Sequence, residues 1–425
     1  MKRVLSAMQG KPYFTENGKP FFWMGDTAWL LFPKLKEEEA YAYLKNRKDK
    51  GFNVIQATLV HFMDEERGMT PPVDGKLTKE QAAYWEHCDR VIDMAGELGL
   101  YMALLPSWGS IVSKGVLNLD NVGKYGRFLA ERYKDRDNII WLLGGDVKGD
   151  GLVPYYERLA TILKETNPER MVGYHPFGRC SSSLWFNDAK WLDFNMFQSG
   201  HRRYDQCQMG AWDDTSNIMS MYGEDNWRYV LHDRELSQRP VLDGEPSYEG
   251  IPQGLHDDTQ PFWGAREVRR YAYWSFLAGA AGHTYGSNAI MQFYDSACGK
   301  KGAYGVREDW REAIDHPGAF QMRYLKELAE SVDYTNGHIA DDLVLGGQRE
   351  RHKRIAVFAG KDYLICYNYL GNAFSLDVSN YIGKDVWFMS PESGAYTPLG
   401  KITAETFSYE PIAGKESTDI VVVIR

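Results

Sequence analysis

The sequence is poor in cysteine and lacks the long apolar runs that mark membrane proteins. Its five cysteines are scattered without CxxC spacing, which argues against a zinc knuckle or a dense disulfide framework and favours free thiols. No segment approaches the length of a membrane span, and the N-terminus lacks the apolar core of a signal peptide. We therefore expect no membrane partner. A cytoplasmic location follows if Met1 is the native start, and a periplasmic or secreted one if a signal peptide was removed.

Long basic runs are also missing. Lys and Arg total 49 against 58 acidic residues, for a net charge of −9. This balance argues against a nucleic-acid partner and is compatible with a neutral or sugar-like ligand. With 425 residues, 44% of them hydrophobic and 14% aromatic, the chain can bury a large core and fill more than one domain.

Short β-rich runs alternate with longer segments of helical period from residue 21 to about residue 285. The helical segments 36–51 and 81–99 both end in glycine, as helix C-caps do. Eight such units over roughly 250 residues predict a (β/α)8 TIM barrel, whose chemistry lies at the C-terminal ends of the strands. The rival is a doubly wound sheet, but no GxGxxG follows the first strand. The predicted strands are FFWMGD, FNVIQATLV, YMALLP, NIIWLLGG, MVGYH, LDFNMFQ, PVLDG and GHTYG.

The pattern of alternating strands and helices ends near DYTNGHIADD, residues 333–342. Beyond it, turn signals alternate with short strands such as IAVFAG, YLICYNY and DIVVVIR. We interpret this region as a small C-terminal β-sandwich. The predicted domains are therefore a catalytic barrel over 1–334 and a β-sandwich over 335–425.

Two acidic residues stand at strand ends that face each other in the predicted barrel. Asp146 closes the fourth strand and Glu245 follows the seventh. Strands four and seven lie on opposite sides of an eight-stranded barrel, so we expect the two carboxylates to meet across its mouth. Glycoside hydrolysis needs such a pair, because one carboxylic acid protonates the leaving oxygen while a second carboxylate attacks or activates water.

Each acid has an alternative interpretation. Asp146 is also a candidate N-cap of the next helix, because Asp is favoured there. Glu is a poor N-cap, and Pro246 holds Glu245 in an extended conformation, so Glu245 is the stronger candidate. Asp243 points to the same side of the strand and is a rival nucleophile, although we expect it to lie deeper.

Most other strand ends carry polar or aromatic residues that are candidates for binding a sugar. Tyr285 is expected to hydrogen-bond Glu245 or only to finish its strand, and each tryptophan is either a stacking surface or simply core. His61, with two of the candidate histidines, could form a metal site, but no HxH or HExxH spacing supports one, so we expect neither metal nor cofactor. The candidate substrate-binding residues are Asp26, Thr27, Trp29, Trp108, His175, Gln198, His201, Tyr285 and Asn288.

The motifs FFWMGDTAW, KGFNVIQ, LLGGD, GEPSYEG and AGAAGHTYGSNAIMQF occur in an order that resembles the apiosidase-like glycoside hydrolases of family 140. The resemblance implies a retaining enzyme with the acid/base at the end of strand four and the nucleophile at the end of strand seven, where Asp146 and Glu245 fall. Gly144 and Gly145 would leave room for the ligand. The tail resembles the β-domain labelled collagen-binding, but we expect it to steady the barrel.

These features predict a retaining, exo-acting glycosidase, of the β-apiosidase type, that removes terminal sugars from plant pectic glycans. Long loops, including 198–214, would wall the site into a pocket and not a groove. The alternatives are another specificity, such as arabinosidase, xylosidase or fucosidase, a carbohydrate-binding barrel without catalysis, and a metal-dependent hydrolase.

Overall fold

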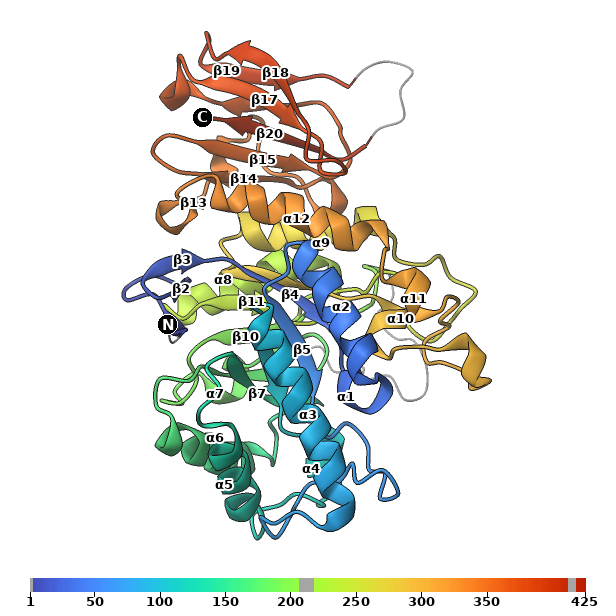
Figure 1. Cartoon of the computed structure of the whole chain (residues 1–425). Helices are drawn as coiled ribbons and strands as arrows, with labels where there is room; N and C mark the ends of the chain where they lie inside the picture. The colour runs from blue at the N-terminus through green and yellow to red at the C-terminus, as the bar shows by residue number, and fades with distance from the viewer. Residues whose placement is uncertain (1–2, 206–217, 412–417) are drawn as a thin grey trace.

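The computed structural model describes residues 3–205, 218–411 and 418–425, which fold into an α/β part and a β-rich part. Residues 206–214 of the predicted loop 198–214, which include one of the five cysteines, Cys207, lie outside these residues. Figure 1 shows the β-rich C-terminal part, in orange and red, stacked on helices α9 and α12 of the α/β part. No helix within the described residues is both long and apolar enough to cross a membrane.

All eight predicted barrel strands are present. Six form one parallel sheet in the order β12-β4-β5-β6-β7-β8, and β10 and β11 pair in parallel beside the short β9. The arrangement is a (β/α)8-like barrel with a C-terminal β-rich domain. The strands are β4 (Trp23–Thr27), β5 (Val54–Thr58), β6 (Tyr101–Leu105), β7 (Ile139–Val147), β8 (Val172–Pro176), β9 (Cys180–Ser181), β10 (Asn195–Gln198), β11 (Val241–Asp243) and β12 (Gly282–Tyr285).

The hydrogen-bond ladder of the barrel is interrupted at two places within the described residues. Between β8 and β10, the amide of Asp193 donates to the carbonyl of Val172 at 2.9 Å. Between β11 and β12, the amide of Ala281 donates to the carbonyl of Val241, also at 2.9 Å. These bonds lie outside the named strand pairs, so the eight strands form no single closed ladder within the described residues.

The helices follow the strands as the predicted βα units require. The two helices expected from periodicity are confirmed as α2 and α3, and Thr78 caps α3 by accepting a hydrogen bond from the amide of Gln81. The longer helices are α2 (Glu37–Asp49), α3 (Lys79–Glu97), α5 (Val122–Tyr133), α6 (Val153–Thr166), α8 (Asn226–Leu236), α9 (Ala265–Leu277) and α12 (Pro317–Glu330). The short ones are α1 (Leu31–Lys34), α4 (Gly109–Ser113), α7 (Ser183–Phe186), α10 (Asn288–Met291) and α11 (Trp310–Ala313).

Side chains of the barrel strands alternate between two apolar clusters. In β6, Ala103 and Leu105 belong to the cluster that fills the barrel, while Met102 and Leu104 belong to the one beneath the helices. Trp85 of α3 lies in that second cluster and is fully buried. The period of two along each strand therefore buries both faces of the sheet, as expected for parallel strands covered by helices.

An N-terminal antiparallel sheet of three short strands, which the sequence analysis did not predict, packs against the beginning of the barrel. It consists of β1 (Leu5–Ala7), β2 (Phe14–Glu16) and β3 (Lys19–Phe21). The ring of Phe14 packs against those of Trp23 and Phe194 at 5.8 and 5.6 Å. Because Trp23 begins β4 and Phe194 precedes β10, this sheet covers the end of the barrel opposite the C-terminal strand ends.

The C-terminal domain is a six-stranded antiparallel sheet with a two-stranded sheet against one face. Its other face rests on the barrel, where the rings of Tyr273 and Tyr367 stack at 4.6 Å. Arg269 of α9 forms a buried ion pair with Asp419 at 2.7 Å, which ties the two parts together. The strands are β13 (His338–Ile339), β14 (Ile355–Ala359), β15 (Leu364–Asn368), β20 (Ile420–Ile424), β17 (Asp385–Met389) and β18 (Tyr396–Lys401), with β16 (Phe374–Asp377) and β19 (Thr406–Tyr409) in the smaller sheet.

A buried ion pair links the first barrel strand to the first long helix. One oxygen of Asp26 in β4 accepts hydrogen bonds from Arg47 Nε at 2.6 Å and from the Tyr43 hydroxyl at 2.5 Å. The side chains of Asp26 and Arg47 are both fully buried. Such a pair is costly to break, because removal of one partner leaves a charge in the protein interior.

We expect Arg47→Ala to lower the free energy of unfolding by about 3–5 kcal/mol, since it leaves the Asp26 carboxylate without its cation. Lys45→Ala on the same helix is the matched control, because the Lys45–Asp49 pair is exposed and solvent screens it, so its loss should change stability little. Urea denaturation of both variants tests the difference. Equal losses of stability would contradict it.

Candidate active site

A pocket of about 410 Å³ opens where the barrel strands end. Asp146, near the end of β7, and Glu245, just after β11, both line it. The two carboxylates that the sequence places on opposite sides of the barrel therefore share one cavity. The loops after β8, β10, β11 and β12 supply most of the remaining wall, through residues 177–179, 198–202, 248, 251, 255, 256, 303 and 304.

Asp146 reaches the pocket because β7 is kinked by two glycines. The φ angles of Gly144, Gly145 and Asp146 are all positive, at 91°, 100° and 56°, and the register with β8 shifts between Gly144 and Val147. A Cβ at Gly144 would lie 2.2 Å from the carbonyl oxygen of His175. Only glycine tolerates such angles and contacts at little cost, whereas Asp is one of the few side chains found in the left-handed region.

The space beside these glycines is occupied by protein, which corrects the expectation that they leave room for a ligand. A Cβ at Gly145 would lie 2.9 Å from the amide nitrogen of Gly109 and about 3.0 Å from the side chain of Leu105. The two glycines instead form a bulge that redirects the end of the strand. The bulge turns the following residue, Asp146, into the pocket.

Two histidines hold the Glu245 carboxylate. His201 Nε2 lies 3.0 Å from Oε1, and His175 Nε2 lies 3.2 Å from Oε2. The His201 contact is a hydrogen bond, whereas the His175 contact does not meet the geometry of one. Glu245 is 7% exposed, and the Gly200 amide donates to its carbonyl at 3.0 Å, so side chain and backbone are both fixed.

The two acids are pushed toward opposite protonation states. Burial and the charge of Glu245 raise the pKa of Asp146 to about 6, against the opposing effects of His175, His201 and a hydrogen bond from Gln198. Burial by itself would raise the pKa of Glu245, but its contacts with His175 and His201 lower it to about 2. Asp146 is thus able to act as an acid near neutral pH while Glu245 is ionised.

An aromatic wall stands next to the carboxylates. Trp29 and Trp108 both line the pocket and contact each other edge to face at 5.2 Å. The ring of His61 stacks on Trp108 at 4.6 Å, and burial lowers the pKa of His61 to about 4, although the Glu245 charge opposes this. His61 is therefore uncharged near neutral pH, and Trp108 is the more exposed of the two tryptophans.

Asp26 and Thr27 do not reach the pocket, which corrects their expected role in binding hydroxyl groups. The carboxylate of Asp26 is fully buried against Arg47 and Tyr43 on the helix side of the sheet. Thr27 is also fully buried, and its hydroxyl accepts a hydrogen bond from the Tyr248 hydroxyl at 3.4 Å. Thr27 therefore contacts a pocket residue from beneath and does not line the pocket itself.

Tyr285 and Asn288 also bond elsewhere. The Tyr285 hydroxyl donates to Glu249 at 2.6 Å and not to Glu245, because Tyr285 points away from the pocket. The Asn288 amide donates to the carbonyls of Gly250 and Tyr304, so it ties together two loops of the pocket wall. Both roles are structural.

The rival nucleophile Asp243 lies below the pocket, as expected. It is fully buried and accepts hydrogen bonds from Ser199 Oγ at 2.7 Å and Asn226 Nδ2 at 3.3 Å. Burial raises its pKa to about 7, against the opposing effect of these hydrogen bonds. Asp243 fixes the loop that follows β10 and has no access to a ligand.

Among the pocket residues that the sequence analysis missed are four with ionisable side chains. One is Tyr304, where burial and the charges of Asp146 and Glu245 raise the pKa of the hydroxyl to about 12. Its position in a glycine-rich loop, 19 residues after β12, gives no signal in the sequence. The others are Arg179, Tyr248 and His256, of which Tyr248 alone belongs to a motif already noted, GEPSYEG.

The C-terminal domain contacts the segment that carries His201. Glu224 accepts hydrogen bonds from the Tyr204 amide at 2.6 Å and from Arg270 at 2.7 Å, and His352 of the C-terminal domain lies 2.7 Å from the same carboxylate. Burial opposes ionisation of Glu224, but His352 and Arg270 outweigh it and keep its pKa below the usual range. The ring of Tyr204 also packs against that of His352 at 5.1 Å. Segment 201–205 is thus held from both parts of the molecule.

The histidines do not gather into a metal site. Within residues 3–205, 218–411 and 418–425, no group of three or more His, Cys, Asp and Glu side chains is arranged to hold a metal ion. His175 and His201 are turned toward Glu245 instead.

Comparison with known proteins gives two family matches. The model for the catalytic domain of apiosidase-like proteins matches residues 8–336, and that for a collagen-binding domain of a collagenase matches residues 340–425. A search of curated proteins gave no match.

Solved structures with similar folds include two at high identity. One is a glycoside hydrolase, 39% identical with a TM-score of 0.90 over 99% of this chain and 96% of that one. Another is a family 5 glycoside hydrolase from Bacteroides vulgatus ATCC 8482, 37% identical with a TM-score of 0.91 over 99% and 93%. A family 5 mannosidase from Rhizomucor miehei, 12% identical with a TM-score of 0.52 over 77% and 99%, shares the fold alone.

We expect His352→Ala to loosen segment 201–205, because Glu224 loses one of the groups that fix it beneath the Tyr204 amide. Hydrogen exchange at that amide should accelerate, and the free energy of unfolding should fall by about 1 kcal/mol, a modest loss since His352 is 38% exposed. His352→Gln, which retains a donor, is the matched control and should preserve protection. Unchanged exchange in the alanine variant would show that the domain does not fix this segment.

Proposed function

The chain belongs to the apiosidase-like family of glycoside hydrolases, and we propose that it is a retaining, exo-acting enzyme that removes terminal sugars from plant pectic glycans. The chain is a glycosidase by its family and by its similarity to solved glycoside hydrolases. The proposal adds the mechanism, the mode of attack and the substrate. A β-linked apiose is the sugar that the family name favours.

Glu245 is the proposed nucleophile. An attacking carboxylate must be ionised, fixed in direction and free of a covering side chain. Glu245 meets these needs, because His175 and His201 keep its pKa low while it still lines the pocket. Its carboxylate would attack the anomeric carbon and form a covalent glycosyl-enzyme as the glycosidic bond breaks.

Asp146 is the proposed acid/base. Its raised pKa leaves a proton for the departing oxygen in the first step, so the leaving group exits as an alcohol. Glycosylation of Glu245 removes the negative charge that helps to raise the Asp146 pKa. The Asp146 carboxylate then accepts a proton from the water that attacks the anomeric carbon, and Glu245 is released.

The shape of the pocket supports attack on a terminal sugar. Its volume of about 410 Å³ lies near the lower end of the range for ligand pockets, and loops from four strands enclose it. Trp108 offers an apolar ring face for the C–H surface of a sugar, and Gln198 and Tyr304 place polar groups near the carboxylates. A chain that continues in both directions would need an open groove instead.

One observation carries the proposal: two carboxylates of opposite protonation tendency line the same pocket. Proton NMR during hydrolysis of pectic side chains tests it, since the first anomer released distinguishes retention from inversion and also identifies the sugar. A first product of inverted configuration would overturn the retaining mechanism. Release of internal fragments before monosaccharides would overturn exo attack.

We expect Glu245→Gln to reduce turnover to near background, since the amide cannot form the glycosyl-enzyme. Asp146→Asn should slow substrates with poor leaving groups by about 10²–10⁴-fold, and should affect activated aryl glycosides far less in the bond-breaking step. Steady-state rates on matched glycosides measure both effects, with circular dichroism to verify folding. Full activity in either folded variant would refute the assigned roles.

The pKa values also predict the pH dependence of kcat/KM. The acid form of Asp146 is present below its pKa of about 6 and is lost as pH rises, so the rate should fall above about pH 6. Glu245 stays ionised down to about pH 2, so no acidic limb from this residue should occur at moderate pH. Gln198→Ala removes a hydrogen bond that lowers the Asp146 pKa and should move the alkaline limb upward. A limb that does not move would argue that another group titrates.

A further inference from the structure

We propose that the flank of the barrel carries a second carbohydrate-binding site, separate from the catalytic pocket, which takes a neutral glycan segment. The site is a groove between helix α6 and the segment 183–193, with a volume of about 940 Å³. None of the residues that line it also lines the catalytic pocket. The proposal rests on the proposed function, in which the chain acts on glycans. It adds that the groove binds the part of the glycan that lies outside the catalytic pocket.

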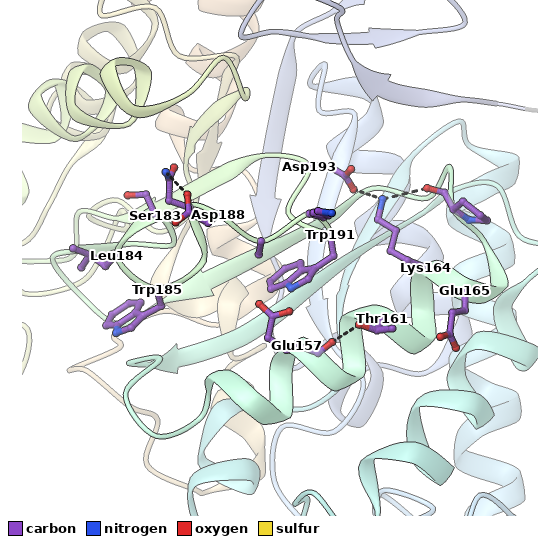
Figure 2. Close-up of a pocket in the computed structure, with 14 residues that line it drawn as sticks. Glu157, Thr161, Lys164, Glu165, Ser183, Leu184, Trp185, Asp188, Trp191 and Asp193 are labelled. Carbon is purple, nitrogen blue, oxygen red and sulfur yellow. Dashed lines mark hydrogen bonds and ion pairs between the residues drawn. The ribbon is translucent and has the colours of Figure 1, made fainter.

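Two tryptophans lie along this groove. Trp185 is half-buried and Trp191 is 6% exposed. Figure 2 shows both indoles above α6, with the Glu157 carboxylate pointing up from the helix beside Trp191. A partly exposed indole offers an apolar face to the C–H surface of a sugar ring, and nearby carboxylates accept hydrogen bonds from its hydroxyl groups.

Several polar groups along the groove have no hydrogen-bond partner among the described residues. The indole N–H of Trp191 is an unpaired donor, and the side-chain oxygen of Asn187 is an unpaired acceptor. The carboxylates of Glu157 and Glu165 also make no ion pair or hydrogen bond in this part of the chain. Buried polar groups are rarely left unpaired, so a polar ligand would satisfy the Trp191 N–H and the Asn187 oxygen, while the half-buried Glu157 and the exposed Glu165 add acceptors at the solvent edge.

The charges along the groove favour a neutral ligand. Four acids line it against two lysines, and Lys164 is already paired with Asp193 at 2.5 Å. A uronic acid polymer would therefore be repelled, whereas neutral sugars would meet carboxylates as hydrogen-bond acceptors. The catalytic pocket differs in this respect, because Arg179 and Arg202 line it together with its two carboxylates.

A second site of this kind would act by raising the local concentration of substrate. Even a weak contact on the flank increases the residence time of a branched glycan whose terminal sugar occupies the pocket. Small substrates that cannot span both places would gain nothing. The site therefore predicts a difference between polymeric and small substrates.

The test uses the Glu245→Gln protein, so that no substrate is consumed during binding. Calorimetric titration with xylohexaose, mannohexaose, α-1,5-arabinohexaose and tri-galacturonate measures affinity and stoichiometry. We expect at least one neutral probe to bind and tri-galacturonate to show no binding that depends on the groove. Trp185→Ala should weaken the neutral probe by at least about fivefold, and Glu157→Gln should weaken it less.

Trp387→Ala is the matched control, because Trp387 is a similarly half-exposed tryptophan on the C-terminal domain. Trp108→Ala reports on the catalytic pocket and should leave binding at the groove intact. In the enzyme with Glu245 restored, Trp185→Ala should retain turnover of small glycosides and lose efficiency on polymers. This comparison separates the groove from the proposed function, which is tested by hydrolysis itself.

Three results would overturn the proposal. The first is that no neutral probe binds, and the second is that Trp185→Ala and Trp387→Ala bind equally well. The third is that Trp108→Ala abolishes binding while Trp185→Ala does not, which would place the probe in the catalytic pocket.

Discussion

The contact of Glu245 with His175 and His201 is the interaction on which the site depends. A carboxylate with 7% exposure would normally be driven toward its neutral form by desolvation. The two imidazoles reverse that tendency, and the resulting charge in turn raises the pKa of Asp146. One ionised group thus sets the protonation state of the other, so the pair cannot be understood as two independent residues.

The backbone conformation at the end of β7 brings the second carboxylate, Asp146, into the same pocket as the charged Glu245. Three successive residues of positive φ at the end of β7 depart from strand geometry and shift the register with β8. The close approach of the His175 carbonyl leaves no space for a side chain at Gly144. Because His175 also contacts Glu245, the bulge and the histidine pair share one residue. The backbone conformation at the end of β7 and the charge of Glu245 are therefore linked through β8, which carries His175.

The C-terminal domain extends this linkage outward. Its contacts with α9 bury aromatic rings and the Arg269–Asp419 ion pair, and His352 meets Glu224 beneath the segment that carries His201. A domain that fixes a segment of the pocket wall in this way is part of the architecture of the site. The collagen-binding label of its family model is not needed to explain its presence.

The sequence by itself determined the order and type of the barrel strands, the two long helices with glycine ends, and the two acids at the ends of strands four and seven. These are local properties, because they follow from the period of hydrophobic residues and from residues that are neighbours along the chain. Tertiary structure alone decided that Asp26 pairs with Arg47, that Tyr285 bonds Glu249, and that Tyr304 enters the pocket. Each depends on partners 20 or more residues away. The sequence at a strand end does not show toward which face a side chain will point, because a bulge or a buried cation elsewhere in the chain can change that direction.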